Sequence, residues 1–257
     1  MKIAAQLYTV REFIQDKDGF ERSMEKIKNI GYDSIQLSGI SKWDAEFIKK
    51  CLDDTGLSMC ATHIPPDMLL NETDRIIAEH KLWDCKYIGI GLYAGLWENN
   101  DKSFREKTDA FAELFTPICE KLHREGMKFM YHNHALEFQH IDGGQTILEY
   151  LVSKMPKGKF GIISDFYWTQ IGGANNMEFI EKYGDLLNVV HFKDLLPQGN
   201  EPKMAPVGEG NINYKKIYKT LKAKGTTDAL AVEQDDCCGD DPFSCLKRSF
   251  DNIKRFM

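Results

Sequence analysis

The chain has 257 residues, a formal net charge of −6, and 42% hydrophobic residues. This length suits one large domain, and the apolar content allows a sizeable core. The acidic balance argues against a dedicated nucleic-acid-binding protein, which usually presents a basic face. We see neither a signal peptide nor an apolar run long enough for a membrane span, and the seven scattered cysteines indicate no disulfide framework or zinc site. We therefore expect a cytoplasmic protein with reduced thiols.

Short apolar segments alternate with amphipathic segments along the whole chain. In chain order the pattern predicts strand 2–8, helix 20–30, strand 33–37, helix 44–52, strand 57–63, helix 71–82, strand 86–91, helix 104–126, strand 127–132, helix 146–152, strand 159–165, helix 177–183, strand 187–192, helix 213–221, strand 229–233 and helix 241–253. Gly31 is placed to end the first helix, and Asp241-Pro242 to begin the last one.

This alternation predicts parallel strands joined by helical crossovers. Eight such units in a chain of this length fit a closed (β/α)8 TIM barrel that spans residues 1–257 as a single domain. The rival fold is an open doubly wound sheet. The sequence has no Gly-x-Gly-x-x-Gly after the first strand and no Walker phosphate loop, which excludes the dinucleotide-binding form of that rival.

Polar side chains end several of the predicted strands, where barrels of this kind place their active sites. They are His63, His132, His134, Asp165, His191 and Glu233. Alternate residues of a strand share a face, so His132 and His134 are expected to point the same way. Imidazole and carboxylate ligands without thiolates suit Mn²⁺, Mg²⁺, Co²⁺ or Zn²⁺. A metal held there could polarise a sugar carbonyl and ease proton removal from the neighbouring carbon.

Five short motifs occur in order along the chain. They are Tyr-His-Asn-His-x-x-Glu-Phe from Tyr131, Ser-Asp-Phe-Tyr-Trp from Ser164, His-Phe-Lys-Asp from His191, Pro-Val-Gly-Glu-Gly from Pro206 and Val-Glu-Gln-Asp from Val232. As a set they resemble the sugar phosphate isomerase/epimerase superfamily, the xylose isomerase-like barrel group that includes inosose dehydratase and ketose 3-epimerases. The resemblance covers the chain from the first strand to the last helix.

This resemblance implies one divalent metal ion, with Mn²⁺ favoured, bound by Asp165, His191 and Glu233. The fourth ligand of the family is usually a glutamate at the end of the fifth strand, where this sequence has His132. Either His132 takes that place or Glu137 reaches back from the following loop. The change puts a two-carboxylate 3-epimerase mechanism in doubt and keeps elimination chemistry open.

Other residues have both a functional and a structural interpretation. Lys193 is predicted either to stabilise a developing enolate oxygen or to form a salt bridge with Asp194. Glu209, in a glycine-flanked loop after the seventh strand, is predicted either to contact the substrate or to be solvated. We expect His63 and His134 to line a substrate pocket, and Trp168 to form an apolar wall there.

We expect a metal-dependent isomerase or epimerase of a small-molecule carbohydrate, with Glu233 as the first choice for the base and His132 or His134 on the other face. The alternative enzyme is a dehydratase or 3-keto-glycoside lyase, which begins with the same proton removal. Two further readings are a non-catalytic sugar-binding barrel and a DNA-repair endonuclease, the latter opposed by the acidic charge. The sequence leaves a homo-oligomer open and indicates no nucleic-acid or membrane partner.

Overall fold

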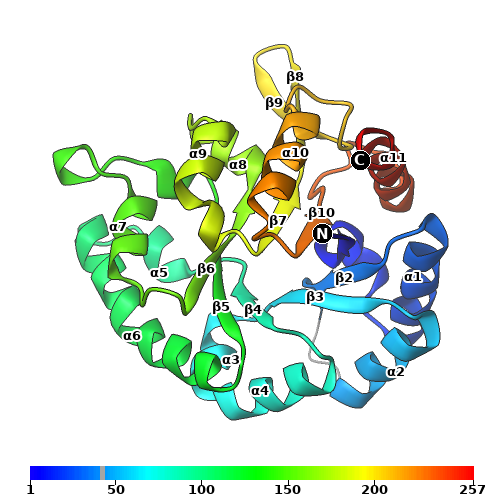
Figure 1. Ribbon diagram of the computed structural model, residues 1–257, viewed down its shortest axis with the longest axis horizontal. Helices are drawn as coiled ribbons and strands as arrows, with labels where there is room; N and C mark the ends of the chain where they lie inside the picture. Colours follow the sequence, from blue (N-terminus) through cyan, green and yellow to red (C-terminus); the bar gives the residue numbers. More distant parts are fainter. Residues whose placement is uncertain (41–43) are drawn as a thin grey trace.

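The structure, a computed structural model, describes residues 1–40 and 44–257. Within these residues eight parallel strands close into a barrel in the order β1-β10-β7-β6-β5-β4-β3-β2, which confirms the predicted (β/α)8 fold (Figure 1). The barrel strands are β1 (Lys2–Gln6), β2 (Ser34–Leu37), β3 (Ser58–His63), β4 (Tyr87–Ile90), β5 (Lys128–His132), β6 (Phe160–Asp165), β7 (Val189–Phe192) and β10 (Ala229–Val232).

Helices surround the barrel on its outside (Figure 1). The α-helices are α1 (Lys17–Ile30), α2 (Ala45–Thr55), α3 (Pro66–Asn71), α4 (Thr73–Leu82), α5 (Ala94–Trp97), α6 (Phe104–Arg124), α7 (Ile147–Lys154), α8 (Phe166–Ile171), α9 (Asn176–Tyr183), α10 (Tyr214–Lys224) and α11 (Pro242–Phe256). Short 3-10 turns are η1 (Leu7–Phe13), η2 (Leu136–Phe138), η3 (Asp142–Gly144) and η4 (Gly184–Leu186). Across the described residues, no helix combines the length and apolarity needed to cross a membrane.

Two of the predicted helix ends are made as expected. Gly31 ends α1 with a φ of 119°, a left-handed conformation that glycine adopts without steric cost. Asp241 caps α11, because its side chain accepts a hydrogen bond of 2.8 Å from the amide of Ser244, and Pro242 follows at the first helical position. The predicted strand 2–8 is wrong at its end, since β1 stops at Gln6 and η1 follows.

Aromatic packing fixes strand β5, which carries the histidine pair predicted for the site. Phe115 of α6 stacks on Phe129 of β5 with ring centroids 5.2 Å apart, and Phe111 stacks on Phe115 at 4.4 Å. All three rings are fully buried. Since each buries a large apolar surface against the outer face of the barrel, β5 cannot shift without exposing them.

The strand register brings the polar strand ends together. Asp165 at the end of β6 pairs directly with His191 of β7. His191 in turn pairs with Ala231 of β10, two residues before Glu233, whose amide donates to the carbonyl of Phe192. Parallel strands therefore deliver these side chains to one rim of the barrel.

A two-stranded hairpin, β8 (Asp194–Gln198) and β9 (Glu201–Ala205), leaves the barrel between β7 and α10 (Figure 1). The carboxylate of Asp194, at its base, is fully buried. It accepts hydrogen bonds of 2.8–3.1 Å from four backbone amides, those of Leu195, Gly208, Gly210 and Ile212. One carboxylate thus joins the start of the hairpin to the loop that follows it.

Replacing Asp194 by alanine should destabilise the protein by about 3 kcal/mol or more, because four buried amides lose their acceptor. The free energy of unfolding from urea titration measures this. Asp251→Ala is the matched control: it removes an exposed carboxylate paired with Lys247 and should cost less than about 1 kcal/mol. Equal effects of the two substitutions would contradict the role given to Asp194.

Candidate active site

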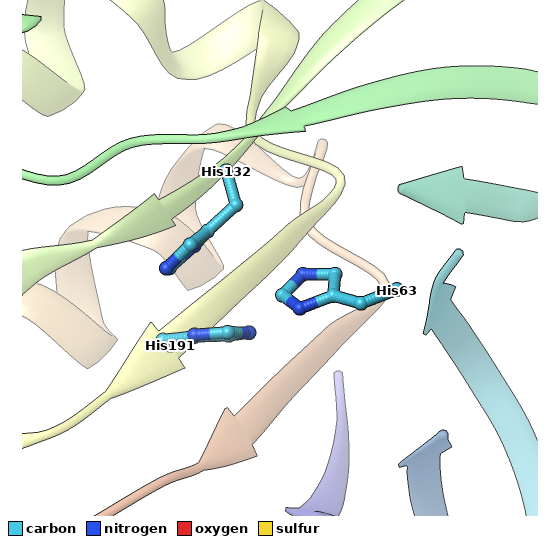
Figure 2. A group of neighbouring side chains, drawn as sticks. All are labelled: His63, His132 and His191. Carbon is cyan, nitrogen blue, oxygen red and sulfur yellow. The ribbon is translucent and has the colours of Figure 1, made fainter. Parts of the chain in front are cut away.

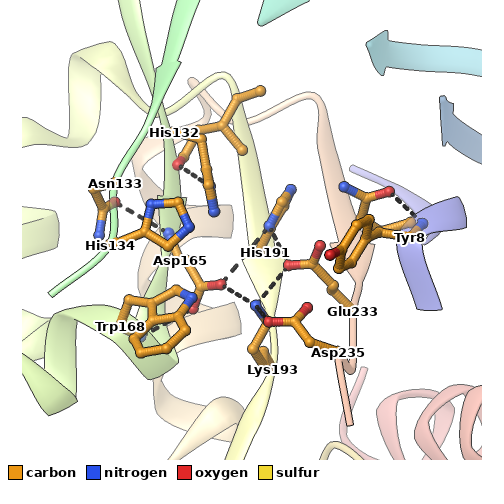
Figure 3. A network of polar contacts seen from close by, with 12 residues as sticks. Tyr8, His132, Asn133, His134, Asp165, Trp168, His191, Lys193, Glu233 and Asp235 are labelled. Atoms are coloured by element: carbon orange, nitrogen blue, oxygen red, sulfur yellow. Dashed lines mark hydrogen bonds and ion pairs between the residues drawn. The ribbon is translucent and has the colours of Figure 1, made fainter. Parts of the chain in front are cut away.

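A cavity of about 310 Å³ opens at the rim formed by the strand ends, and we call it the rim cavity. Its walls come from loops and strand ends all round this side of the barrel. The lining residues are Tyr8, Ser38, His63, Gly91, Leu92, His132, His134, Lys193, Glu233 and Asp235. Figure 3 shows most of the polar members converging on one point.

Two of the lining residues, His132 and Glu233, belong to a compact donor cluster of four side chains. His132, Asp165, His191 and Glu233 each offer one ligand atom, and these atoms all lie within 4.8 Å of one another. A second trio, His63, His132 and His191, satisfies the same distance, and Figure 2 shows the three rings facing one another from three different strands. The structure thus brings together four of the five residues predicted as candidate ligands, His132, Asp165, His191 and Glu233.

A glutamine fixes the orientation of His191. The Nε2 of His191 lies 2.8 Å from Oε1 of Gln36, an acceptor, so this nitrogen carries a proton. Nδ1 faces the carboxylates, 2.9 Å from Glu233 and 3.8 Å from Asp165. Burial lowers the pKa of His191, but the Glu233 and Asp165 carboxylates outweigh it and raise the pKa to about 9. Loss of the proton on Nδ1 would leave this nitrogen free to act as a metal ligand.

His132, unlike His191, has a lowered pKa and is neutral. Burial, together with the nearby His191, holds its pKa well below the usual value. Its Nδ1 lies 3.3 Å from the carbonyl of Ile163, which as an acceptor directs the proton to Nδ1 and leaves Nε2 free. The neighbouring Asn133 accepts a hydrogen bond of 3.2 Å from the amide of Asp165. Because alternate residues of a strand point to opposite faces, His132 belongs to the cluster while Asn133 bonds to the backbone of β6.

A lysine ammonium lies between the carboxylates of the cluster. Nζ of Lys193 is 2.9 Å from Asp165, 2.8 Å from Glu233 and 3.0 Å from Asp235, and the side chain is 1% exposed. Burial lowers the pKa of Lys193, but the three carboxylates more than offset this and raise it well above the usual value. The predicted salt bridge to Asp194 is wrong, because Asp194 is engaged by backbone amides.

His63, His134 and Trp168 surround the cluster. His63 and His134 both line the rim cavity, and burial lowers their pKa values to about 3 and about 4, so both are neutral near pH 7. The ring of Trp168 lies 5.5 Å from the ring of His134 and 5.5 Å from Nζ of Lys193. The tryptophan thus stands beside the ammonium, as a cation–π partner that limits its movement.

Glu137, the alternative fourth ligand, is held away from the cluster. Its carboxylate is fully buried and accepts hydrogen bonds of 2.6 Å from the Tyr131 hydroxyl and 2.8 Å from the amide of His134. Both carboxylate oxygens are therefore used to fix the turn after β5. Glu137 is therefore not part of the donor cluster.

Glu209, a predicted substrate contact, also lies elsewhere. Both of its carboxylate oxygens bind the exposed guanidinium of Arg248, at 2.9 and 2.8 Å. The loop glycine Gly210 is required for packing against Asp194 and not for approach of a substrate. A Cβ at Gly210 would come within 2.4 Å of the Asp194 carboxylate, so that glycine is needed for the close approach of Asp194 and not of a ligand.

Two polar residues of the site were assigned no role from the sequence. Gln36 orients His191, and Asp235 binds Lys193. Burial and the neighbouring Glu233 raise the pKa of Asp235 to about 6. Gln36 could have been identified from its position at the end of the second strand, and Asp235 from its place in the Val-Glu-Gln-Asp motif.

The donor set fits a divalent metal ion. Two imidazoles and two carboxylates are the ligand types that Mn²⁺, Co²⁺, Mg²⁺ and Zn²⁺ accept, and no thiolate competes among the four. The orienting hydrogen bonds on His132 and His191 are the kind of outer contacts that metal-binding histidines make.

Removing the buried ammonium should destabilise the metal-free protein. Lys193→Met leaves the Asp165 and Glu233 carboxylates facing each other without a cation, so we expect a loss of about 3–5 kcal/mol in the free energy of unfolding, measured in EDTA. Lys247→Met, at an exposed lysine, is the control and should cost less than about 1 kcal/mol. A Lys193→Met protein as stable as its parent would contradict this account.

Solved structures share this fold at low sequence identity. A sugar phosphate isomerase/epimerase from Parabacteroides distasonis ATCC 8503 aligns at a TM-score of 0.78 and 20% identity, over 99% of this chain and 98% of its own. The 3-keto-D-glucoside 4-epimerase YcjR from E. coli aligns at 0.74 and 18%, over 99% of each chain. The IOLI protein, solved with a bound zinc atom, aligns at 0.75 and 14%, over 100% of this chain and 98% of its own.

No curated protein matches the sequence at a significant level. The sequence does match a family model, which is described as the xylose isomerase-like TIM barrel and covers residues 24–252. This match extends over most of the barrel and includes every residue of the donor cluster. The chain therefore belongs to the xylose isomerase-like TIM barrel family.

Proposed function

We propose that this protein is a divalent-metal-dependent isomerase or epimerase that acts on a sugar, keto-sugar or cyclitol. The observation that carries the proposal is the cluster of His132, Asp165, His191 and Glu233. Two of its members, His132 and Glu233, line a cavity of about 310 Å³ together with the ammonium of Lys193. The epimerase activity of YcjR and the zinc of the IOLI protein support it.

The cluster residues would hold the metal, with Mn²⁺ favoured and Mg²⁺, Co²⁺ or Zn²⁺ as alternatives. When bound, such an ion polarises a substrate carbonyl and acidifies the adjacent C–H. Lys193 keeps its charge near pH 7 and can stabilise the oxygen on which negative charge develops.

Proton transfer is assigned to two groups on different strands. Glu233 lines the cavity, and the nearby Lys193 and His191 charges outweigh its burial and keep its pKa well below the usual value, so it is an ionised carboxylate that can accept a proton. His134 lines the same cavity from the loop after β5 and is neutral. Since β6 and β7 separate β5 from β10, the two groups approach a substrate from different sides, as isomer formation requires.

Elimination is the second candidate, and one observation favours it. Asp235 lines the cavity, contacts Lys193 and has a pKa raised to about 6, so a fraction of this carboxyl is protonated near neutral pH. It could give its proton to a leaving hydroxyl or alkoxide after the C–H proton is removed. The first step is shared, so only the product distinguishes a dehydratase or lyase from an isomerase.

Metal content measured by mass spectrometry, on protein purified without a tag or chelator, tests the first half of the proposal. We expect about one Mn, Co, Mg or Zn per chain, with a large loss in Glu233→Gln because a ligand carboxylate is replaced. Glu209→Gln is the matched control and should retain the metal, since Glu209 binds Arg248 at the surface. No metal in the parent protein, even after incubation with excess Mn²⁺, would refute the mechanism.

Products formed from a panel of keto-sugars and cyclitols test the second half. The panel is scored for isomer formation and for loss of water or an alcohol. Isomers without elimination support the first candidate, and elimination products support the second. Turnover that persists at the parental rate in Asp165→Ala, which removes a cluster carboxylate, would show that the chemistry occurs elsewhere.

Metal affinity should rise with pH. A proton on His191 must leave before its Nδ1 can bind a metal, and the pKa of this group is about 9 in the metal-free protein. Below that pH each unit should therefore weaken binding about tenfold, so Co²⁺ should bind about ten times more tightly at pH 7.5 than at pH 6.5. Calorimetric titration at the two pH values measures this, and equal dissociation constants would contradict the protonated state assigned to His191.

A further inference from the structure

A second cavity, of about 380 Å³, lies beside the rim cavity, and we call it the side cavity. It lies between the segments that follow β2 and β3. Its walls are mostly apolar, with Leu37, Ile48, Ile64, Met68 and Trp83 among the lining residues. Neither the cluster nor the proton transfer proposed above uses it.

The two cavities share a wall. Ser38, His63, Gly91 and Leu92 line both of them, so a molecule in one lies next to the other. His63 is the central member, with its ring 5.1 Å from His132 and 5.5 Å from His191 (Figure 2). A Cβ at Gly91 would come within 2.9 Å of the His63 ring, so the glycine leaves room at this junction. The side cavity is thus an extension of the site and not a separate surface feature.

The charges on the described residues that line the side cavity balance one another. Among the described residues that line it, the charged ones are Arg75 and Glu79, and Arg75 binds both Glu79 and Glu72. His63, the titratable group at the junction, is neutral because burial lowers its pKa to about 3. Among the described lining residues the charge of Arg75 is therefore already offset by carboxylates, whereas an uncharged apolar group would replace water against apolar walls.

We propose that the substrate has two parts, a sugar or cyclitol ring in the rim cavity and an uncharged hydrophobic substituent, such as an aromatic aglycone, in the side cavity. The proposal rests on the function proposed above, which places the sugar ring. The volumes of the two cavities, about 310 and 380 Å³, are each within the range of small-molecule sites. A cavity of about 150 Å³ already accommodates benzene, so the side cavity has room for a substituted ring.

Binding of matched glycosides tests this inference. The probes are phenyl and methyl β-D-glycosides of glucose, galactose, mannose and xylose, titrated by calorimetry into the full chain with 1 mM Mn²⁺. Burial of the phenyl ring should make the phenyl member of at least one pair bind about tenfold or more tightly than its methyl partner.

Met68 lines the side cavity but not the rim cavity, so variants at this residue test whether the phenyl group binds in the side cavity. Met68→Lys introduces a charge and Met68→Trp fills space, so each should abolish the phenyl preference while the methyl glycoside binds as before. Met68→Leu is the conservative control and should keep the preference. Two blocking variants are used so that poor folding of one, detected from its melting temperature, leaves the other as the test.

The inference is overturned if the two members of every pair bind with equal affinity or if neither member of any pair binds. It is also overturned if the phenyl preference survives in both blocking variants. Failure of the proposed function is distinguishable from this result. It would appear as an absence of metal and turnover while the Met68-dependent phenyl preference persists. Conversely, metal binding and turnover of simple sugars without any phenyl preference would leave the function intact and refute only the substrate class.

Discussion

The structure depends on the neutralisation of buried charge at one end of the barrel. Asp165, Glu233 and Asp235 gather around the Lys193 ammonium, and the first two are almost wholly buried. Isolated charges at this depth would cost several kcal/mol each, so the group is stable only as a set. The same charges keep a proton on His191 and keep Glu233 ionised. Protonation at the candidate site is therefore set by geometry that the barrel itself provides.

Much of this arrangement could be predicted from sequence because parallel strands leave few choices. Once eight strands alternate with eight helices, the residue that ends each strand must lie at one rim. The phase of the strands then indicates which side chains face inward, and this reasoning selected Asp165 and His191, which prove to be register partners. It also selected His132 over its neighbour Asn133. These inferences needed only the period of a strand.

Residues in loops were beyond that reasoning, because no period constrains them. Glu137 and Glu209 are both carboxylates near rim motifs, yet one fixes a turn through Tyr131 and the other pairs with Arg248. Only the folded chain shows these partners. The hairpin formed by β8 and β9 was concealed by Pro197 and Pro202, residues that argue against a central strand but are tolerated in a ribbon open to solvent. The side cavity is lined by several separate segments between Leu37 and Leu92 and has no local signature.

The position of Asp194 has a consequence for how the molecule fluctuates. It follows Lys193 directly, so the anchor of the hairpin and the cation of the charged centre are adjacent residues of one segment. An opening that released the four amides from Asp194 would also loosen the backbone that holds the ammonium. The hairpin and the charged centre would then exchange amide hydrogens as one cooperative unit, separate from the helices on the far side of the barrel.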